Sequence, residues 1–220
     1  MDNRELVNLL KKCQKDAVLY AEVILRICPE LSGKETTELT SQQRHALIRL
    51  TEIVLAKEKA WHTPELLTEQ ERADSIKKGI TIKAGKGVGK DAWLAIAMLW
   101  FLACHKNSKI LCTANSKSQL KDILWSDLSK FLKGGEHLAP GTDRPAISQE
   151  FETQADRIFS LSPGDGVKPG AQWFITARTC NRDADQTTQE NVLSGYHGEY
   201  MLLCADEAAG LPDAVFKPIE

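Results

Sequence analysis

The segment that decides the fold reads Ile80-Thr81-Ile82-Lys83-Ala84-Gly85-Lys86-Gly87-Val88-Gly89-Lys90-Asp91. Residues 80–84 predict a short β-strand. Residues 85–89 hold three glycines, which let the backbone wrap so that successive N–H groups point at a phosphate. The apolar run at 92–104 then predicts a buried helix whose N-terminal dipole attracts an anion. Strand, glycine turn and helix in this order are typical of a nucleotide-binding P-loop.

Lys90 and Asp91 close this segment with the charges that a bound triphosphate needs. Lys90 is predicted to reach the β- and γ-phosphates as a mobile positive charge. Asp91 stands where P-loops usually carry the Ser or Thr that meets Mg²⁺, and a carboxylate is also a hard oxygen ligand. A glycine-rich turn with an accidental lysine is the alternative. The predicted nucleotide-binding residues of this segment are Gly85, Lys86, Gly87, Val88, Gly89, Lys90 and Asp91.

A second motif follows more than a hundred residues later, where the apolar residues 201–205 end in Asp206 and Glu207. Nucleotides bind at the carboxyl ends of strands in open α/β sheets. We therefore expect Asp206 to hold Mg²⁺ and Glu207 to orient and polarise the attacking water. Taken alone, this motif could also be a strand followed by a loop that begins with two acidic residues and has no catalytic role. Paired with the P-loop, it predicts ATP hydrolysis.

The remaining pattern predicts one three-layer α/β domain with a mainly parallel sheet and an N-terminal helical appendage. We assign residues 1–38 to the appendage and its linker, and residues 39–220 to the P-loop domain. Many Gly, Pro and Asp residues predict an extended loop at 134–170. Further helices are expected at 4–28, from Thr40 or Ser41 to about Ala60, after Thr63-Pro64 and at 116–132, with further strands near 109–113, 172–177 and 200–205.

Composition limits the partners and the compartment. The formal net charge of the 220 residues is −2, so any contact with DNA must come from a local patch. The six cysteines form no Cys-x-x-Cys pair, which suits reduced thiols in the cytoplasm. The apolar run at 92–104 has 13 residues, too few to cross a bilayer of ~30 Å, and no membrane association is expected.

Several blocks, in order, resemble the large subunit of phage terminases. The glycine turn at 85–91 resembles a P-loop variant of one branch of that family. Residues 112–125 contain Cys-Thr-Ala-Asn-Ser-Lys-Ser-Gln-Leu and then Leu-Trp, which resembles the family's A-P-T-x-x-Q segment with a following L-W. Gly-Tyr-His-Gly at 195–198 and Asp-Glu-Ala-Ala-Gly-Leu-Pro-Asp at 206–213 resemble its G-aromatic-H-G and D-E-A-x-G-h-P-D stretches.

The resemblance implies a RecA-like core that uses ATP and Mg²⁺ to package double-stranded DNA in the host cytoplasm. Portal protein and the small terminase subunit are the implied partners, in a possible homo-oligomeric ring. The stretch at 39–43 resembles the family's adenine-recognising glutamine motif, so Gln42 and Gln43 are expected near the base; a solvated helix start is the alternative. Lys86 stands where the family often has a catalytic arginine, and lysine cannot grip a phosphoryl group bidentately.

The family's coupling motif and its nuclease domain would lie beyond Glu220, so no nuclease activity is expected. The resemblance also implies a later strand between the P-loop strand and the Asp-Glu strand, without which the sheet has a gap. A truncated product or fragment is therefore our hypothesis.

Two other functions stay open on the sequence. One is a helicase-like P-loop ATPase, although interleaved aromatic residues that would stack on bases are lacking. The other is a truncated nucleotide-binding or assembly module without turnover. Four lysines add positive charge around the predicted helix at 116–132, although a solvated helical face explains them as well: Lys117, Lys121, Lys130 and Lys133.

Overall fold

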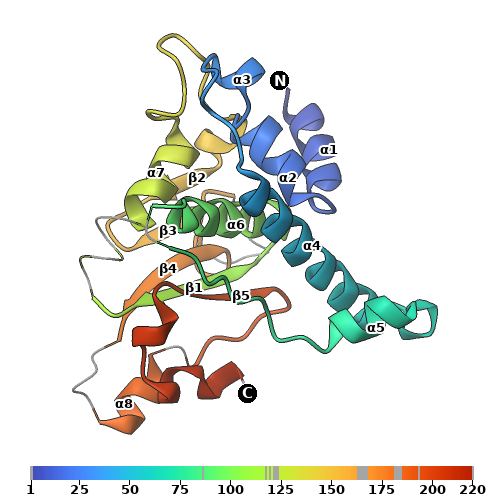
Figure 1. The fold of residues 1–220 in the computed structure, drawn as a ribbon, viewed down its shortest axis with the longest axis vertical. Coiled ribbons are helices and arrows are strands. Elements are labelled where there is room, and N and C mark those ends of the chain that lie inside the picture. The colour runs from blue at the N-terminus through green and yellow to red at the C-terminus, as the bar shows by residue number, and fades with distance from the viewer. Residues whose placement is uncertain are drawn as a thin grey trace.

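The computed structural model describes residues 2–85, 87–116, 118, 120, 124–162, 168–180, 185–192 and 194–219. Figure 1 shows one sheet with helical segments on both of its faces. Helix α6 (Lys90–Cys104) packs on one face and contacts α7 (Trp125–Lys133). The other face is covered by the segment that includes α8 (Gln186–Asn191), η5 (Ala208–Gly210) and η6 (Asp213–Ile219). The mixed α/β class and the layers agree with the prediction.

The sheet has five strands in the order β2-β3-β4-β1-β5. They are β1 (Lys109–Ala114), β2 (Phe151–Thr153), β3 (Arg157–Ser160), β4 (Phe174–Thr179) and β5 (Met201–Ala205). Strand β1 is parallel to both β4 and β5, whereas β3 is antiparallel to both β2 and β4. The prediction of a mainly parallel sheet was therefore wrong for the half of the sheet that contains β2 and β3.

That antiparallel half comes from the segment 134–170, which we expected to be a loop. It contains η4 (Ala146–Gln149) as well as β2 and β3. These elements are three or four residues long, too short to show a clear hydrophobic period among the Gly, Pro and Asp residues. Their buried side chains, including Phe151 and Ile158, join the main core.

The strand predicted at residues 80–84 does not form. This segment lies outside the sheet with mostly exposed side chains, and Ile82 is 40% exposed. Strand β5 is the last strand of the sheet, and no described strand pairs with its outer edge. A strand is held by the backbone hydrogen bonds of a neighbour, and residues 80–84 have none here. This is the side on which the resemblance implied a further strand.

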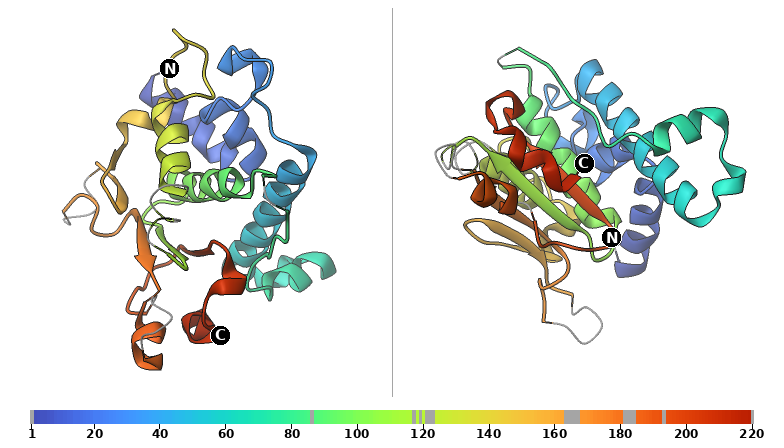
Figure 2. Two further views of the ribbon diagram at one scale, coloured as in Figure 1. Left: turned by 60° about the vertical axis from the view of Figure 1, so that its left-hand side comes forward. Right: turned by 90° about the horizontal axis from the view of Figure 1, so that it is seen from below.

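The N-terminal region contains more and shorter helices than the spacing of its apolar residues predicted. Instead of one helix over 4–28, a new start at Asp16 interrupts the run, because the Asp16 side chain accepts a hydrogen bond from Leu19 N. Thr40 caps α4 as predicted. The elements are α1 (Asn3–Cys13), α2 (Ala17–Leu19), η1 (Tyr20–Ile24), α3 (Pro29–Ser32), α4 (Ser41–His62), η2 (Pro64–Leu66) and α5 (Glu69–Ser75). Figures 1 and 2 show α5 projecting from the body of the molecule.

Helix α6 is the centre of the core, and its residues are buried on all sides from Ala95 to Ala103. The indole Nε1 of Trp100 donates to Cys13 O at 2.8 Å, which ties α1 to α6. The buried hydrophobic side chains between Leu6 and Ile27 belong to the same hydrophobic cluster as α6. The domain boundary at residue 38 remains a prediction. No helix in the described ranges is both long and apolar enough to cross a bilayer.

Candidate functional site

The two predicted motifs meet at the carboxyl end of β5. Lys90 is the first residue of α6, and Asp206 and Glu207 directly follow β5. Lys90 Nζ lies 3.7 Å from Asp206 Oδ1 and 3.5 Å from Glu207 Oε1. The lysine and the glutamate are 117 residues apart in the chain. The fold therefore brings a cation and two carboxylates from distant segments to one place.

The glycine turn has the backbone that its sequence requires. Gly87 and Gly89 have φ angles of +80° and +76°, in the left-handed region that side chains with a Cβ rarely adopt. At Gly89, a Cβ atom would lie 2.6 Å from Gln43 Nε2. Val88 is 41% exposed at the tip of the turn. Lys86 lies outside the described residues, so its predicted role stays a prediction.

The charges around Lys90 and Asp91 depend on each other. Desolvation disfavours the charged form of Lys90, but the carboxylates of Asp206, Asp91 and Glu207 together outweigh it and raise the lysine pKa. Desolvation, followed by the charge of Asp206, raises the pKa of Asp91. Three carboxylates thus act on one lysine among the described residues at this point.

Asp91 and Asp206 are the two candidate ligands for Mg²⁺. Asp91 Oδ1 is buried and has no hydrogen-bond partner among the described residues, and the Asp206 side chain is 7% exposed. No three His, Cys, Asp or Glu side chains of the described residues gather into a metal site. Mg²⁺ is usually held by one or two carboxylates together with waters and substrate phosphates, so this pair fits such a site.

Glu207 has an unusual backbone for a residue with a side chain. Its φ of +49° lies in the left-handed region, where non-glycine residues are uncommon. The preceding residue is fixed to the neighbouring strand, because Asp206 N donates to Thr113 O at 2.9 Å. The chain therefore turns sharply at the end of β5, and the turn directs the Glu207 carboxylate toward Lys90. Such local strain is often found at functional sites.

The two glutamines occupy different surroundings. Gln42 is exposed on the first turn of α4. The amide oxygen of Gln43 accepts from Thr40 N at 3.0 Å, and its nitrogen donates to Gly89 O at 2.9 Å. Gln43 also lines a hollow of about 300 Å³ together with Leu39 and Phe131. It therefore connects the start of α4 directly to the glycine turn.

Three polar residues near the site were given no role from the sequence, although Thr113 and Asn115 belong to the block at 112–120 that resembles the terminase segment. Thr113 Oγ1 and Asn115 Oδ1 are buried near the end of β1 and have no hydrogen-bond partner among the described residues. The sequence feature that could have indicated Thr113 and Asn115 is their position at the carboxyl end of an apolar strand. Asp127 of α7 contributes to the raised pKa of Asp91. Its proximity results from the packing of α7 against α6, which no local pattern encodes.

Comparison with known proteins gives one informative relative. A curated protein described as a probable terminase large subunit, from Enterobacteria phage P7, is 24% identical to this chain over 183 residues. The match covers 83% of this chain and 33% of that protein, so the chain spans about a third of the relative's length. No family model and no solved structure matches the chain. The similarity supports the relationship to terminase large subunits that the ordered motifs predicted.

Proposed function

We propose that this chain is the ATP-binding and ATP-hydrolysing part of a DNA-packaging motor similar to the phage terminase large subunits. The observation on which the proposal rests is the convergence of Lys90 with Asp206 and Glu207 beside a glycine turn in the left-handed conformation. A lysine at this distance from the two acids is positioned to exchange them for phosphate oxygens.

Each side chain has a distinct part in the proposed reaction. Lys90 binds the β- and γ-phosphates, and the N–H groups of the turn through Gly89 surround them. Asp91 and Asp206 would hold Mg²⁺, and the bound ion would supply positive charge to the phosphate oxygens. Glu207 orients a water molecule for in-line attack and accepts its proton.

The hollow next to Gln43 is suited to the adenine base. An amide has two N–H donors and two oxygen lone pairs, so Gln43 keeps one of each after its contacts to Thr40 and Gly89. Leu39 and Phe131 belong to the apolar part of a lining that also contains polar and charged side chains, and such a mixture can bind a flat heterocycle with polar edges. Binding of the base would thereby be transmitted to the glycine turn through the Gln43 amide.

Double-stranded DNA, portal protein, small terminase subunit and a ring of copies are proposed partners by similarity to the relative. Because that relative is about three times as long as the matched part, the remaining functions of such motors are not assigned to this chain. If duplex DNA is the partner, the chain binds it through phosphate contacts, and the affinity for DNA falls steeply as the salt concentration rises.

The proposal is tested by Mg²⁺-dependent ATP turnover and ATP binding, each measured with and without duplex DNA. We expect Lys90→Ala to lose binding and turnover together. We expect Glu207→Gln to keep binding while turnover falls by a factor of about 100 or more. Lys12→Ala on the exposed side of α1 is the matched control for loss of one positive charge.

The other outcomes point to the alternatives. Binding without turnover in the wild type, unchanged by Glu207→Gln, would favour a nucleotide-binding or assembly module. Turnover stimulated by single-stranded rather than duplex DNA would favour a helicase-like ATPase.

A further inference from the structure

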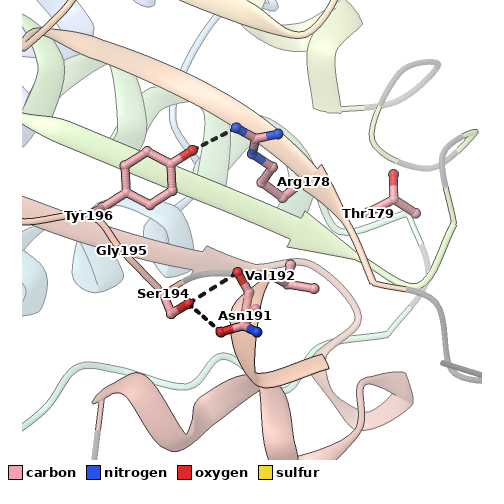
Figure 3. Close-up of a pocket in the computed structure, with 7 residues that line it drawn as sticks. All are labelled: Arg178, Thr179, Asn191, Val192, Ser194, Gly195 and Tyr196. Carbon is pink, nitrogen blue, oxygen red and sulfur yellow. Dashed lines mark hydrogen bonds between the residues drawn. The ribbon is translucent and has the colours of Figure 1, made fainter. Parts of the chain in front are cut away.

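A second hollow lies on the other face of the sheet from α6. Its volume is about 360 Å³. Its wall includes Tyr196 and Val192, which pack with Leu111 and Phe174 in a separate small hydrophobic cluster on that face. Figure 3 shows the residues that line it: Arg178, Thr179, Asn191, Val192, Ser194, Gly195 and Tyr196.

Among the described residues of this lining, Arg178 is the charged one, and its side chain is hydrogen-bonded. Its Nη2 donates to the hydroxyl of Tyr196 at 2.7 Å (Figure 3). The Tyr196 ring in turn packs edge to face on Phe174, with 6.1 Å between ring centroids. Within the described part of the chain, no carboxylate lies within ion-pair distance of Arg178. The hollow thus presents a hydrogen-bonded positive charge that no acid of the described residues pairs with.

The other lining groups match the chemistry of a phosphate. Thr179 and Ser194 supply hydroxyl groups, and Asn191 supplies an amide. Arginine together with Ser, Thr, Asn and Tyr side chains is the set that contacts phosphate oxygens in nucleic-acid complexes. The planar guanidinium also offers two parallel N–H groups to a phosphate. We propose that this hollow is a phosphate-binding site, separate from the site at Lys90.

The strand register explains how the two sites are separated. Arg178 is opposite Thr113 on β1, and Thr113 is opposite Ala205 on β5, the residue before Asp206. Two strand spacings of ~4.8 Å put the Arg178 and Ala205 backbones about 10 Å apart along the same edge. The phosphate at Arg178 belongs either to a nucleic-acid backbone or to a free phosphate or mononucleotide. Only the first of these sources rests on the proposed function.

The test uses the full chain in two binding assays. The first measures the affinity for a fluorescent DNA duplex of about 20 base pairs at several salt concentrations, and the second follows inorganic phosphate by ³¹P line broadening. Arg178→Gln should weaken duplex affinity about tenfold and reduce the slope of log K against log salt by about one. Arg4→Gln, which removes an exposed arginine from α1, is the matched control and should change both quantities much less.

Two further variants separate a binding role from a folding defect. Tyr196→Phe keeps the ring on Phe174 but removes the hydroxyl that accepts from Arg178, so a two- to threefold loss of duplex affinity is expected, because the guanidinium loses its orientation but keeps its charge. Arg178→Lys keeps the charge and should recover part of the affinity. Thermal unfolding of each variant shows whether the fold is intact.

A loss in the duplex assay alone identifies a phosphodiester as the occupant, and a loss in the inorganic phosphate assay identifies a free phosphate. Equal behaviour of Arg178→Gln and Arg4→Gln in both assays would overturn the proposal. Neither assay measures ATP turnover, so failure of the proposed ATPase would be seen separately, in the Lys90→Ala comparison.

Discussion

The two ends of helix α6 differ in what their polar groups contact. At the C-terminal end, Trp173 Nε1 donates to Leu102 O at 2.7 Å, and two residues earlier in α6 Trp100 Nε1 donates to Cys13 O. At the N-terminal end, Asp91 Oδ1 is buried without a partner among the described residues. An unpartnered buried polar group costs about 1–3 kcal/mol. The C-terminal end of α6 is therefore bonded to two other segments, although His105 Nε2 there is also buried without a hydrogen-bond partner among the described residues, whereas the N-terminal end keeps a buried carboxylate oxygen that a metal ion would contact.

The largest expected effect is at the C-terminal end. Trp100→Ala removes a fully buried indole and its hydrogen bond to α1, so we expect the free energy of unfolding to fall by about 3–5 kcal/mol. Chemical denaturation measures this change. Trp61→Ala is the control, because Trp61 is 81% exposed on the projecting end of α4 and its loss should cost less than about 0.5 kcal/mol. Equal losses in the two variants would contradict the described core.

The next largest effect concerns how the unfolding free energy depends on pH, through His105 at the C-terminal end of α6. Burial lowers the pKa of His105 from 6.5 to about 4, and its Nε2 lies 3.5 Å from Glu58 Oε1. The ring is therefore neutral at pH 7 and this contact is not an ion pair there. Because the unfolded chain binds the proton more tightly, the contribution of His105 is fully present above pH 6.5 and is lost between pH 6.5 and about 4.

The lost contribution of His105 amounts to about 3 kcal/mol. His105→Phe should flatten the curve of unfolding free energy against pH in that window. His62→Asn, at an exposed position, is the control for the loss of one histidine. The same slope in wild type and His105→Phe would show that other groups cause the acid sensitivity.

A smaller effect is expected at the N-terminal end, where Gly89→Ala forces a Cβ into the left-handed region and against Gln43 Nε2. We expect a loss of about 1–3 kcal/mol in stability and weaker ATP binding. Adding Gln43→Ala should recover the steric part of the loss but not the part due to φ. Gly79→Ala, where nothing lies within 4 Å, is the stability control.

The smallest expected effect is an increase in stability, at Asp91 in the N-terminal end of α6. The pKa of Asp91 is raised, mainly by burial, so its charged form destabilises the fold at pH values above that pKa. Asp91→Asn should therefore raise the unfolding free energy at pH 7 by about 0.5–1 kcal/mol while Mg²⁺-dependent turnover falls. Thermal unfolding and turnover measured on the same preparation decide this. A destabilised Asp91→Asn would mean that the carboxylate has a structural role.

The sequence predicted those parts of the fold that local patterns encode. The apolar run at 92–104 forms a helix buried on all sides, and Thr40 caps α4 through a reciprocal contact with Gln43. The short strands β2 and β3 were missed, and residues 80–84 failed to form a strand. A strand depends on its neighbours, and neighbours distant in sequence leave no local signal.

The sequence by itself determined the order of a glycine turn, a lysine and a later acidic pair. These residue types at this spacing indicate phosphate and metal binding without knowledge of the fold. Only the tertiary structure decided that Lys90 lies within 4 Å of Asp206 and Glu207 and that Gln43 bonds to Gly89. It alone also placed Arg178 beside Tyr196 in a second hollow. The physical reason is that these contacts join segments that are far apart in the sequence. Strand pairing and the packing of α6 bring those segments together, and both depend on the whole hydrophobic core.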